Sequence, residues 1–111
     1  MYSLVYTLRI SEPMKVVRNV LQFEWDQGNR GKNFKRHKVT DEECEEAFFD
    51  PEKKILRGRL HSDREERFVM LGKTKRDRLL FVVFTMRSDK IRIISARDLG
   101  RKEIPLYGKK A

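Results

Sequence analysis

The longest uninterrupted apolar run in the chain, within RLLFVVFT at residues 78–85, limits its fold more than any other feature. The short length of the run and its β-branched and aromatic residues predict a strand, and its lack of alternation predicts a strand covered on both faces. Short polar connections at residues 72–77 and 86–90 join it to two further apolar segments, residues 67–71 and 91–95. Connections of this length predict antiparallel hairpins, so we expect a meander that contains the 78–85 strand.

Further elements are expected ahead of this meander. The stretch VLQFEW at residues 20–25 alternates apolar and polar residues, which predicts a half-buried strand, and residues 55–60 form a weaker strand pattern. Asp26 fits the N-cap of a short polar helix over residues 27–38, in which Phe34 is the expected apolar anchor. The basic cluster of this helix consists of Arg30, Lys32, Lys35, Arg36 and Lys38.

A second helix is marked more clearly. Thr40 and Glu43 have the spacing of a capping box, and Val39 can contact Cys44 as a hydrophobic staple. The helix is expected to end at the Asp-Pro pair of residues 50–51. The acids in its first turn suit the helix dipole, so they are explained without a metal site. One helical face is formed by Cys44, Ala47 and Phe48.

The order of these elements predicts the fold class. Residues 98–107 have a helical pattern that Pro105 limits to one or two turns. A strand, two helices, three or four strands and a short helix make an α+β pattern, with a small antiparallel sheet and helices packed on it. We expect one domain over residues 20–111, with residues 1–19 as an N-terminal extension or an edge segment.

The composition excludes several classes of protein. The chain has one cysteine, Cys44, which rules out an internal disulfide and a CxxC metal site, and its two histidines lie too far apart in sequence for a ligand cluster. No run of 18 apolar residues and no secretion signal is recognisable, which favours a cytoplasmic protein without a membrane segment.

The charge distribution indicates the kind of partner. The chain holds 26 Lys and Arg against 17 Asp and Glu, for a net charge of +9. Residues 41–52 hold seven acids and no base, whereas residues 53–111 hold 18 bases and 7 acids. A positive field of this kind attracts polyanions, above all nucleic acid, although a solvated basic surface is an equally simple explanation.

Arginines at strand positions are the first candidates for chemistry. Arg67 precedes FVML, Arg92 lies within IRII, and Arg97 follows Ser95 and Ala96. Guanidinium groups on a rigid sheet can clamp a phosphate through bidentate hydrogen bonds. The alternative is that they pair with neighbouring acids or extend to water. The other candidate groups are His37 and His61, which titrate near neutral pH, and Glu103 and Tyr107, which follow Arg97 closely.

Several blocks of sequence occur together in an order that resembles a known family. The blocks are FEWD (23–26), NFKRHKVT (33–40), AFFD (47–50), HSDREERFVMLG (61–72), LLFVVFT (79–85) and IRIISAR (91–97), followed by Glu103 and Tyr107. Over about residues 22–107 the chain resembles the BrnT toxins of bacterial type II toxin–antitoxin systems. The resemblance implies a RelE-like fold and an endoribonuclease that uses no metal or other cofactor and arrests growth. It also implies a ribbon-helix-helix antitoxin similar to BrnA, bound to the toxin in a hetero-oligomer.

The resemblance also suggests which residues act. Carried over by motif, the catalytic candidates are Arg67, Ser95 and Arg97, together with Glu103. Tyr107, which the resemblance also carries over, is an RNA-binding candidate. The other RNA-binding candidates are chosen for their residue types and not by the resemblance: Arg92, Arg101, Lys102 and His61. The chain departs from the family pattern at Lys38, where members usually have glycine, and at the Asn-Arg pair 29–30. It departs again at Gly100 and at the Ile-Pro pair 104–105, which we expect to interrupt the final helix.

Two functions remain open at this point. In the first, the ribose 2′-OH attacks the adjacent phosphate, and Arg67 and Arg97 stabilise the charge that develops on the phosphoryl oxygens. Arginine is a poor base because its pKa is above about 12, so Glu103, His61 or a lysine must accept the proton. In the second, the protein is a basic RNA-binding or partner-binding module without catalysis, in which the arginines only position the ligand.

Overall fold

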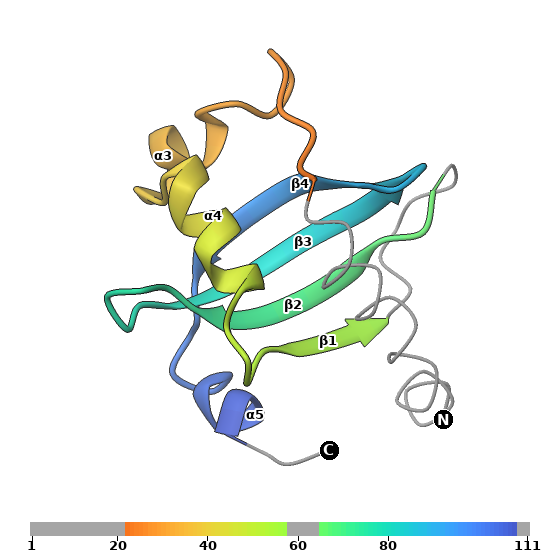
Figure 1. The fold of residues 1–111 in the computed structure, drawn as a ribbon. Helices are drawn as coiled ribbons and strands as arrows, with labels where there is room; N and C mark the ends of the chain where they lie inside the picture. Colours follow the sequence, from red (N-terminus) through yellow and green to blue (C-terminus); the bar gives the residue numbers. More distant parts are fainter. Residues whose placement is uncertain (1–21, 58–64, 109–111) are drawn as a thin grey trace.

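The computed structural model of this chain describes residues 22–57 and 65–108. Four strands form one antiparallel sheet in the order β1-β2-β3-β4, so the predicted α+β meander is confirmed (Figure 1). The elements are α3 (Lys32–His37), α4 (Asp41–Phe48), β1 (Lys54–Arg57), β2 (Phe68–Lys73), β3 (Leu79–Arg87), β4 (Lys90–Asp98) and α5 (Ile104–Gly108). The predicted N-terminal segment of residues 1–19 lies outside the described residues, and no described helix is long and apolar enough to cross a membrane.

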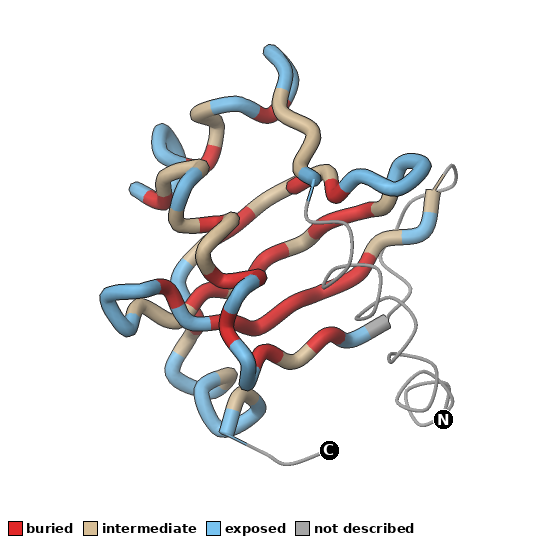
Figure 2. Tube along the Cα trace, viewed as in Figure 1, coloured by how far each residue is buried: buried red, intermediate tan, exposed pale blue. Residues whose placement is uncertain are grey.

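One face of the sheet, here called the first face, carries the main core. Alternate residues of β3, Leu80, Val82 and Phe84, point to this face and are fully buried. Helix α4 packs across it (Figure 1), and the Phe48 ring meets the Phe84 ring edge to face at a centroid distance of 5.0 Å. Figure 2 shows that most of the buried residues lie in the sheet and in the side of α4 that faces it.

The opposite or second face is less completely covered, so the predicted double coverage of β3 is only partly right. Phe81 and Val83 point to this face and are half-buried, and they pack with Val69, Leu71 and Leu99 into a smaller apolar cluster. The reason is that the 8-residue α4 packs its apolar side on the first face, whereas the short α5 contributes only Tyr107 to the cluster on the second face.

The start of α4 agrees with the sequence prediction. The backbone N–H of Glu43 donates to Thr40 Oγ1 at 3.0 Å, and the backbone N–H of Thr40 donates to Glu43 Oε1 at 2.9 Å. Val39 and Cys44 are both fully buried in the same core cluster, as a hydrophobic staple requires. The capping box therefore fixes where α4 begins, between the buried residues Val39 and Cys44.

The region before α4 was predicted less well. Residues 22–25 are not a strand, because Phe23 forms only an isolated parallel bridge with Ile91, and residues 20–21 lie outside the described residues. The first helix begins at Lys32 rather than at residue 27, and its N-cap is Gly31 at φ 69° rather than Asp26. Asp26 Oδ1 instead accepts from the Gly28 N–H in a preceding turn.

The buried side of α3 was also predicted wrongly. Phe34, the expected anchor, is 48% exposed, whereas Asn33 is 1% exposed. The physical reason is that β4 is an edge strand, so the backbone N–H and C=O groups on its outer side need hydrogen-bond partners. Asn33 Oδ1 accepts from the Ala96 N–H at 3.0 Å, and Asn29 Nδ2 donates to the Ile93 carbonyl at 3.1 Å. Two buried asparagines thus close this sheet edge and attach α3 to it.

The final helix is shorter than the helical pattern of residues 98–107 that predicted it. Residues 101–103 form a turn, and α5 starts at Ile104, so Pro105 lies in the first turn of the helix and does not interrupt it. An N–H has no intrahelical partner in the first turn, so a proline is tolerated there. Gly100 supplies the acceptor for this turn, because its carbonyl receives hydrogen bonds from the N–H groups of Glu103 and Ile104.

Gly72 marks the closest approach of α4 to the sheet. A Cβ atom on Gly72 would lie 2.6 Å from the Ala47 carbonyl oxygen and 2.7 Å from Met70 Sδ. We expect Gly72→Ala to lower the free energy of unfolding by about 1–3 kcal/mol, because the backbone of α4 must move away. Chemical denaturation measures this loss, with Gly108→Ala, where a Cβ meets nothing within 4 Å, as the matched control. Equal stability of the two variants would contradict the packing described here.

Candidate active site

The second face of the sheet collects most of the sequence-predicted site residues. The register pairs Ser95 with Val83 and Arg97 with Phe81, so both β4 residues share the face of the smaller apolar cluster. A register shift between Val83 and Phe84 inserts one extra residue in β4 at this level. Because a bulge changes which side chains point to a given face, Ser95 and Arg97 point to the second face although Ile93, earlier in the same strand, is buried in the core of the first face.

Arg97 is held by a carboxylate and an aromatic ring. Its Nη1 and Nη2 each donate to one oxygen of Glu103 at 2.8 Å, and its Cζ lies 4.1 Å from the centre of the Phe81 ring. Nη1 also donates to the Asp98 carbonyl at 3.1 Å. The hydrogen bonds with Glu103 raise the pKa of Arg97 and keep it charged.

This arrangement leaves one edge of the guanidinium group available. Glu103 takes the edge formed by the two terminal nitrogens, and within the described residues neither Nε nor the second hydrogen of Nη2 has a partner. Those two N–H groups form the side edge of the planar fork, which can bind two phosphate oxygens at once. The side chain is 40% exposed, so a phosphate can approach it from solvent.

Glu103 is better suited to orient Arg97 than to accept a proton. The hydrogen bonds from Arg97, followed by the one from the Gly100 N–H at 2.7 Å, lower the pKa of Glu103 to about 2. A carboxylate with so low a pKa is a weak base near neutral pH. Glu103 is therefore the least suitable of the proton acceptors that the sequence left open.

The depressed pKa of Glu103 predicts how the ion pair responds to acid. Because the folded value lies below the ordinary value of 4.5, the pair contributes stability above about pH 4.5 and loses it as the pH falls toward 2. We expect the Glu103 carboxyl carbon to titrate at least one pH unit below an ordinary glutamate in an NMR titration. In Arg97→Gln, the same signal is expected to move back toward 4.5. An unshifted titration in the unchanged protein would contradict the pairing.

Tyr107 fastens α5 to the sheet. Its hydroxyl donates to Asp50 Oδ2 at 2.6 Å, and the same oxygen accepts from the Lys73 N–H at 2.8 Å. Burial, followed by this hydrogen bond, raises the pKa of Tyr107 above its usual range. The hydroxyl therefore keeps its proton near neutral pH, and its contacts indicate that Tyr107 positions the helix that follows Glu103.

Arg67 lies at the end of β2 and has an unsatisfied group. Its Nε is buried and has no hydrogen-bond partner within the described residues. Continued by one residue, the β2–β3 register puts Arg67 opposite Thr85. Strand spacing and rise then give roughly 16 Å between the Cα atoms of Arg67 and Arg97. By this register the two arginines belong to the same face, but they lie too far apart to meet at one phosphate.

The remaining candidates are placed differently. Arg92 Nη1 donates to Glu24 at 3.1 Å and to Asp26 at 2.9 Å, and these bonds raise the pKa of Arg92. Its guanidinium group thus ties residues 22–26 to β4, as the alternative of pairing with acids anticipated. Arg101 and Lys102 are exposed in the turn before α5, and His61 lies outside the described residues.

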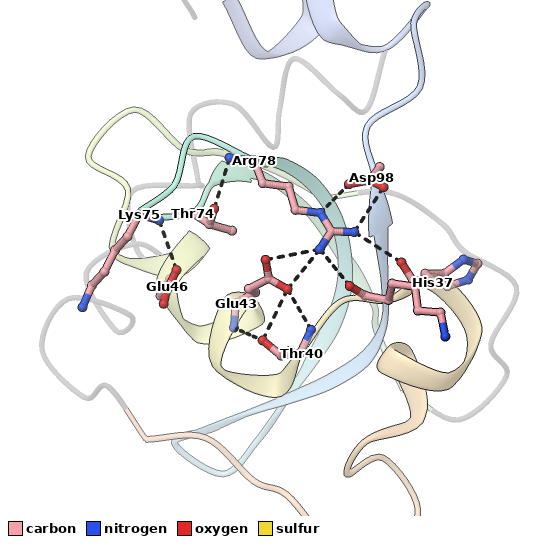
Figure 3. A network of polar contacts seen from close by, with 9 residues as sticks. His37, Thr40, Glu43, Glu46, Thr74, Lys75, Arg78 and Asp98 are labelled. Atoms are coloured by element: carbon pink, nitrogen blue, oxygen red, sulfur yellow. Dashed lines mark hydrogen bonds and ion pairs between the residues drawn. The ribbon is translucent and has the colours of Figure 1, made fainter.

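Arg78 was not among the site residues predicted from the sequence, and its side chain joins several segments of the fold (Figure 3). Its Nε donates to Asp98 at 2.6 Å, and its Nη1 donates to Glu43 at 3.0 Å. Nη1 and Nη2 also donate to the carbonyls of Lys38 and His37. The available signal was an arginine at the start of the longest apolar run. No spacing rule, however, joins residues 35 and 20 positions apart.

No group of three or more His, Cys, Asp or Glu side chains that could hold a metal ion occurs in the part of the chain that the structure describes.

Residues 25–103 match the family described as ribonuclease toxin, BrnT, of type II toxin-antitoxin system. This span contains Arg67, Ser95, Arg97 and Glu103. No curated protein matches the chain.

Proposed function

The chain belongs to the BrnT family of type II toxin–antitoxin toxins, and on this premise we propose that it is a metal-independent endoribonuclease. The observation that carries the proposal is Arg97. Its guanidinium group is fixed on Phe81 and paired end-on with Glu103, and its side edge is available beside Ser95. The proposed reaction forms no covalent bond between RNA and protein, so it needs hydrogen-bond donors that are fixed around the phosphate.

In the proposed reaction, the ribose 2′-OH loses its proton and attacks the adjacent phosphorus, and the bond from phosphorus to the 5′-oxygen of the next nucleotide breaks as that oxygen gains a proton. The products are a 2′,3′-cyclic phosphate and a 5′-hydroxyl, so no water and no other reactant is consumed. Arg97 donates to the phosphoryl oxygens as their charge increases, and Ser95 donates a hydrogen bond from the same strand. Arg67 contacts the RNA farther along the second face. The proton acceptor is a group other than Glu103 or Tyr107, because their pKa values are shifted in the wrong directions.

In a type II system a protein antitoxin acts against the toxin. We propose a BrnA-like antitoxin of the ribbon-helix-helix type, which covers the second face and neutralises the toxin in a cytoplasmic hetero-oligomer. The support is the surface beside Glu103, where Ile104 and Leu106 of α5 are each 46% exposed. Exposed apolar side chains next to a site are typical of a surface that a partner covers.

A direct test is incubation of the purified toxin with a labelled RNA in EDTA, followed by analysis of the product ends. We expect fragments that end in a 2′,3′-cyclic phosphate, and no cleavage of the same sequence made with 2′-deoxyribose. Cleavage that requires added metal would contradict the metal-independent reaction. RNA that stays intact would instead support the second candidate, a basic binding module without catalysis. The engagement of Glu103 and Tyr107 in structural hydrogen bonds favours this candidate.

A further inference from the structure

Helix α3 carries a concentration of positive charge that the reaction does not use. The α3 basic patch consists of Arg30, Lys32, Lys35, Arg36 and Lys38. No acidic residue occurs between Asp26 and Asp41. Within the described residues, no ion pair joins any of these five cations to a carboxylate. Figure 2 shows this part of the chain mostly exposed, so the charge of the patch is not neutralised by the fold.

An exposed aromatic ring lies within this patch. Phe34 is 48% exposed, and Lys38 Nζ lies 5.2 Å from the centre of its ring. A phenylalanine that faces solvent among lysines contributes little to the core of this fold. Bases of single-stranded nucleic acid stack on such rings, while neighbouring cations bind the phosphates between them. An exposed aromatic ring among basic side chains is therefore a more specific indication of nucleic-acid binding than positive charge alone.

The patch is held rigidly next to the candidate active site. Asn33, on the buried side of α3, accepts from the Ala96 N–H, and Ala96 lies between Ser95 and Arg97 in β4. The conformation of the helix end also supports a functional reason for its charge. Lys38 adopts a left-handed conformation at φ 59°, which favours glycine, and yet a lysine occupies the position. A strand of RNA that crosses the outer edge of β4 can contact both surfaces.

We propose that the α3 basic patch with Phe34 is a second RNA-contact surface, which binds single-stranded RNA on one side of the scissile phosphate. The inference rests on the proposed ribonuclease function for its choice of ligand. The patch binds phosphates through its cations and stacks a base on Phe34. The proposal assigns substrate affinity to α3 and the chemical step to the second face of the sheet.

The test measures binding separately from cleavage. The probe is a fluorescein-labelled 2′-O-methyl RNA of about 12 nucleotides, which cannot be cleaved by 2′-OH attack, and fluorescence anisotropy gives its Kd over a range of salt concentrations. In the triple variant Lys32→Gln, Lys35→Gln and Arg36→Gln, we expect at least about tenfold weaker binding. The slope of log affinity against log salt is expected to fall by about 2, because each phosphate contact on a single strand contributes about 0.7.

A matched control removes the same charge elsewhere. Lys75 and Arg76 are exposed in the turn between β2 and β3, and Lys90 is exposed at the start of β4; their triple change to Gln is expected to leave the slope nearly unchanged. Phe34→Ala is expected to weaken binding by about tenfold at constant charge, whereas Phe34→Tyr retains the stacking ring. Circular dichroism of each variant shows whether α3 and the fold persist.

The outcomes separate this inference from the proposed function. If the toxin does not cleave RNA but the patch variants lose binding and the control does not, the nuclease proposal fails and the contact surface stands. If the toxin cleaves RNA and the folded patch variants bind the probe as tightly as the control, the contact surface is overturned alone. Unchanged RNA binding together with lost antitoxin binding would overturn it in favour of a protein partner.

Discussion

Arg97→Ala is expected to lower the rate of RNA cleavage by about two to three orders of magnitude and to abolish growth arrest, while the protein stays folded. The loss of a fixed donor to a developing oxyanion typically has this size. The fold is expected to persist because Arg97 is partly exposed, and its partner Glu103 remains hydrogen-bonded to the Gly100 N–H. Single-turnover cleavage of a defined RNA measures the effect on the chemical step.

Two further variants show whether the effect comes from the geometry of the guanidinium group. Arg97→Lys keeps the charge but loses the planar fork, so it is expected to recover only a small part of the activity. Arg76→Ala removes an exposed arginine from the turn between β2 and β3, which is not among the site candidates, and serves as the matched control, with activity within a few-fold of the unchanged protein. A folded Arg97→Ala protein that cleaves RNA at the normal rate would overturn the assignment of Arg97.

Arg78→Ala is expected to produce the largest loss of stability, about 2–3 kcal/mol in the free energy of unfolding. Breaking a buried ion pair costs about 3–5 kcal/mol, and the partial exposure of Arg78 and Asp98 reduces this figure. The change also leaves the carbonyls of His37 and Lys38 without their donor. For a chain of this size the loss corresponds to roughly 10 °C in Tm, which calorimetry measures.

The control for this prediction is Arg76→Ala, which removes an exposed arginine from the same turn. It is expected to change the free energy of unfolding by less than about 0.5 kcal/mol. Arg78→Lys keeps one positive charge but cannot contact Glu43 and Asp98 together, so an intermediate stability is expected. If Arg78→Ala and Arg76→Ala were equally stable, the network in Figure 3 would have no structural importance.

Local signals in the sequence were sufficient for most of the fold. The hairpins on both sides of β3 follow from an apolar run with short polar connections, and the start of α4 follows from the Thr40 and Glu43 pair. Both features depend on residues within a few positions of one another. The side of α3 that is buried could not be predicted, because Asn33 faces the sheet to accept a hydrogen bond from the N–H of Ala96, which lies 63 residues away in sequence.

The candidate site shows the same division. The motif blocks identified Arg97 and Glu103 as neighbours in sequence, and the structure joins these two residues, six positions apart, through a pair of hydrogen bonds. The sequence could not distinguish an arginine that keeps an edge available from one that carboxylates occupy. Arg92 and Arg97 lie on the same strand, yet Arg92 is occupied by two carboxylates from residues 24–26 and Arg97 keeps an edge available.

The sequence by itself determined the family, the antiparallel meander and the positive charge, because each depends on residue types and short-range spacing. Only the tertiary structure decided which arginines keep an edge without a carboxylate partner, that Glu103 pairs with Arg97, and that Phe34 faces solvent. These properties depend on which carboxylates and backbone groups from distant segments lie within hydrogen-bond distance. Such contacts arise when the sheet and helices pack, and no local pattern of residues encodes them.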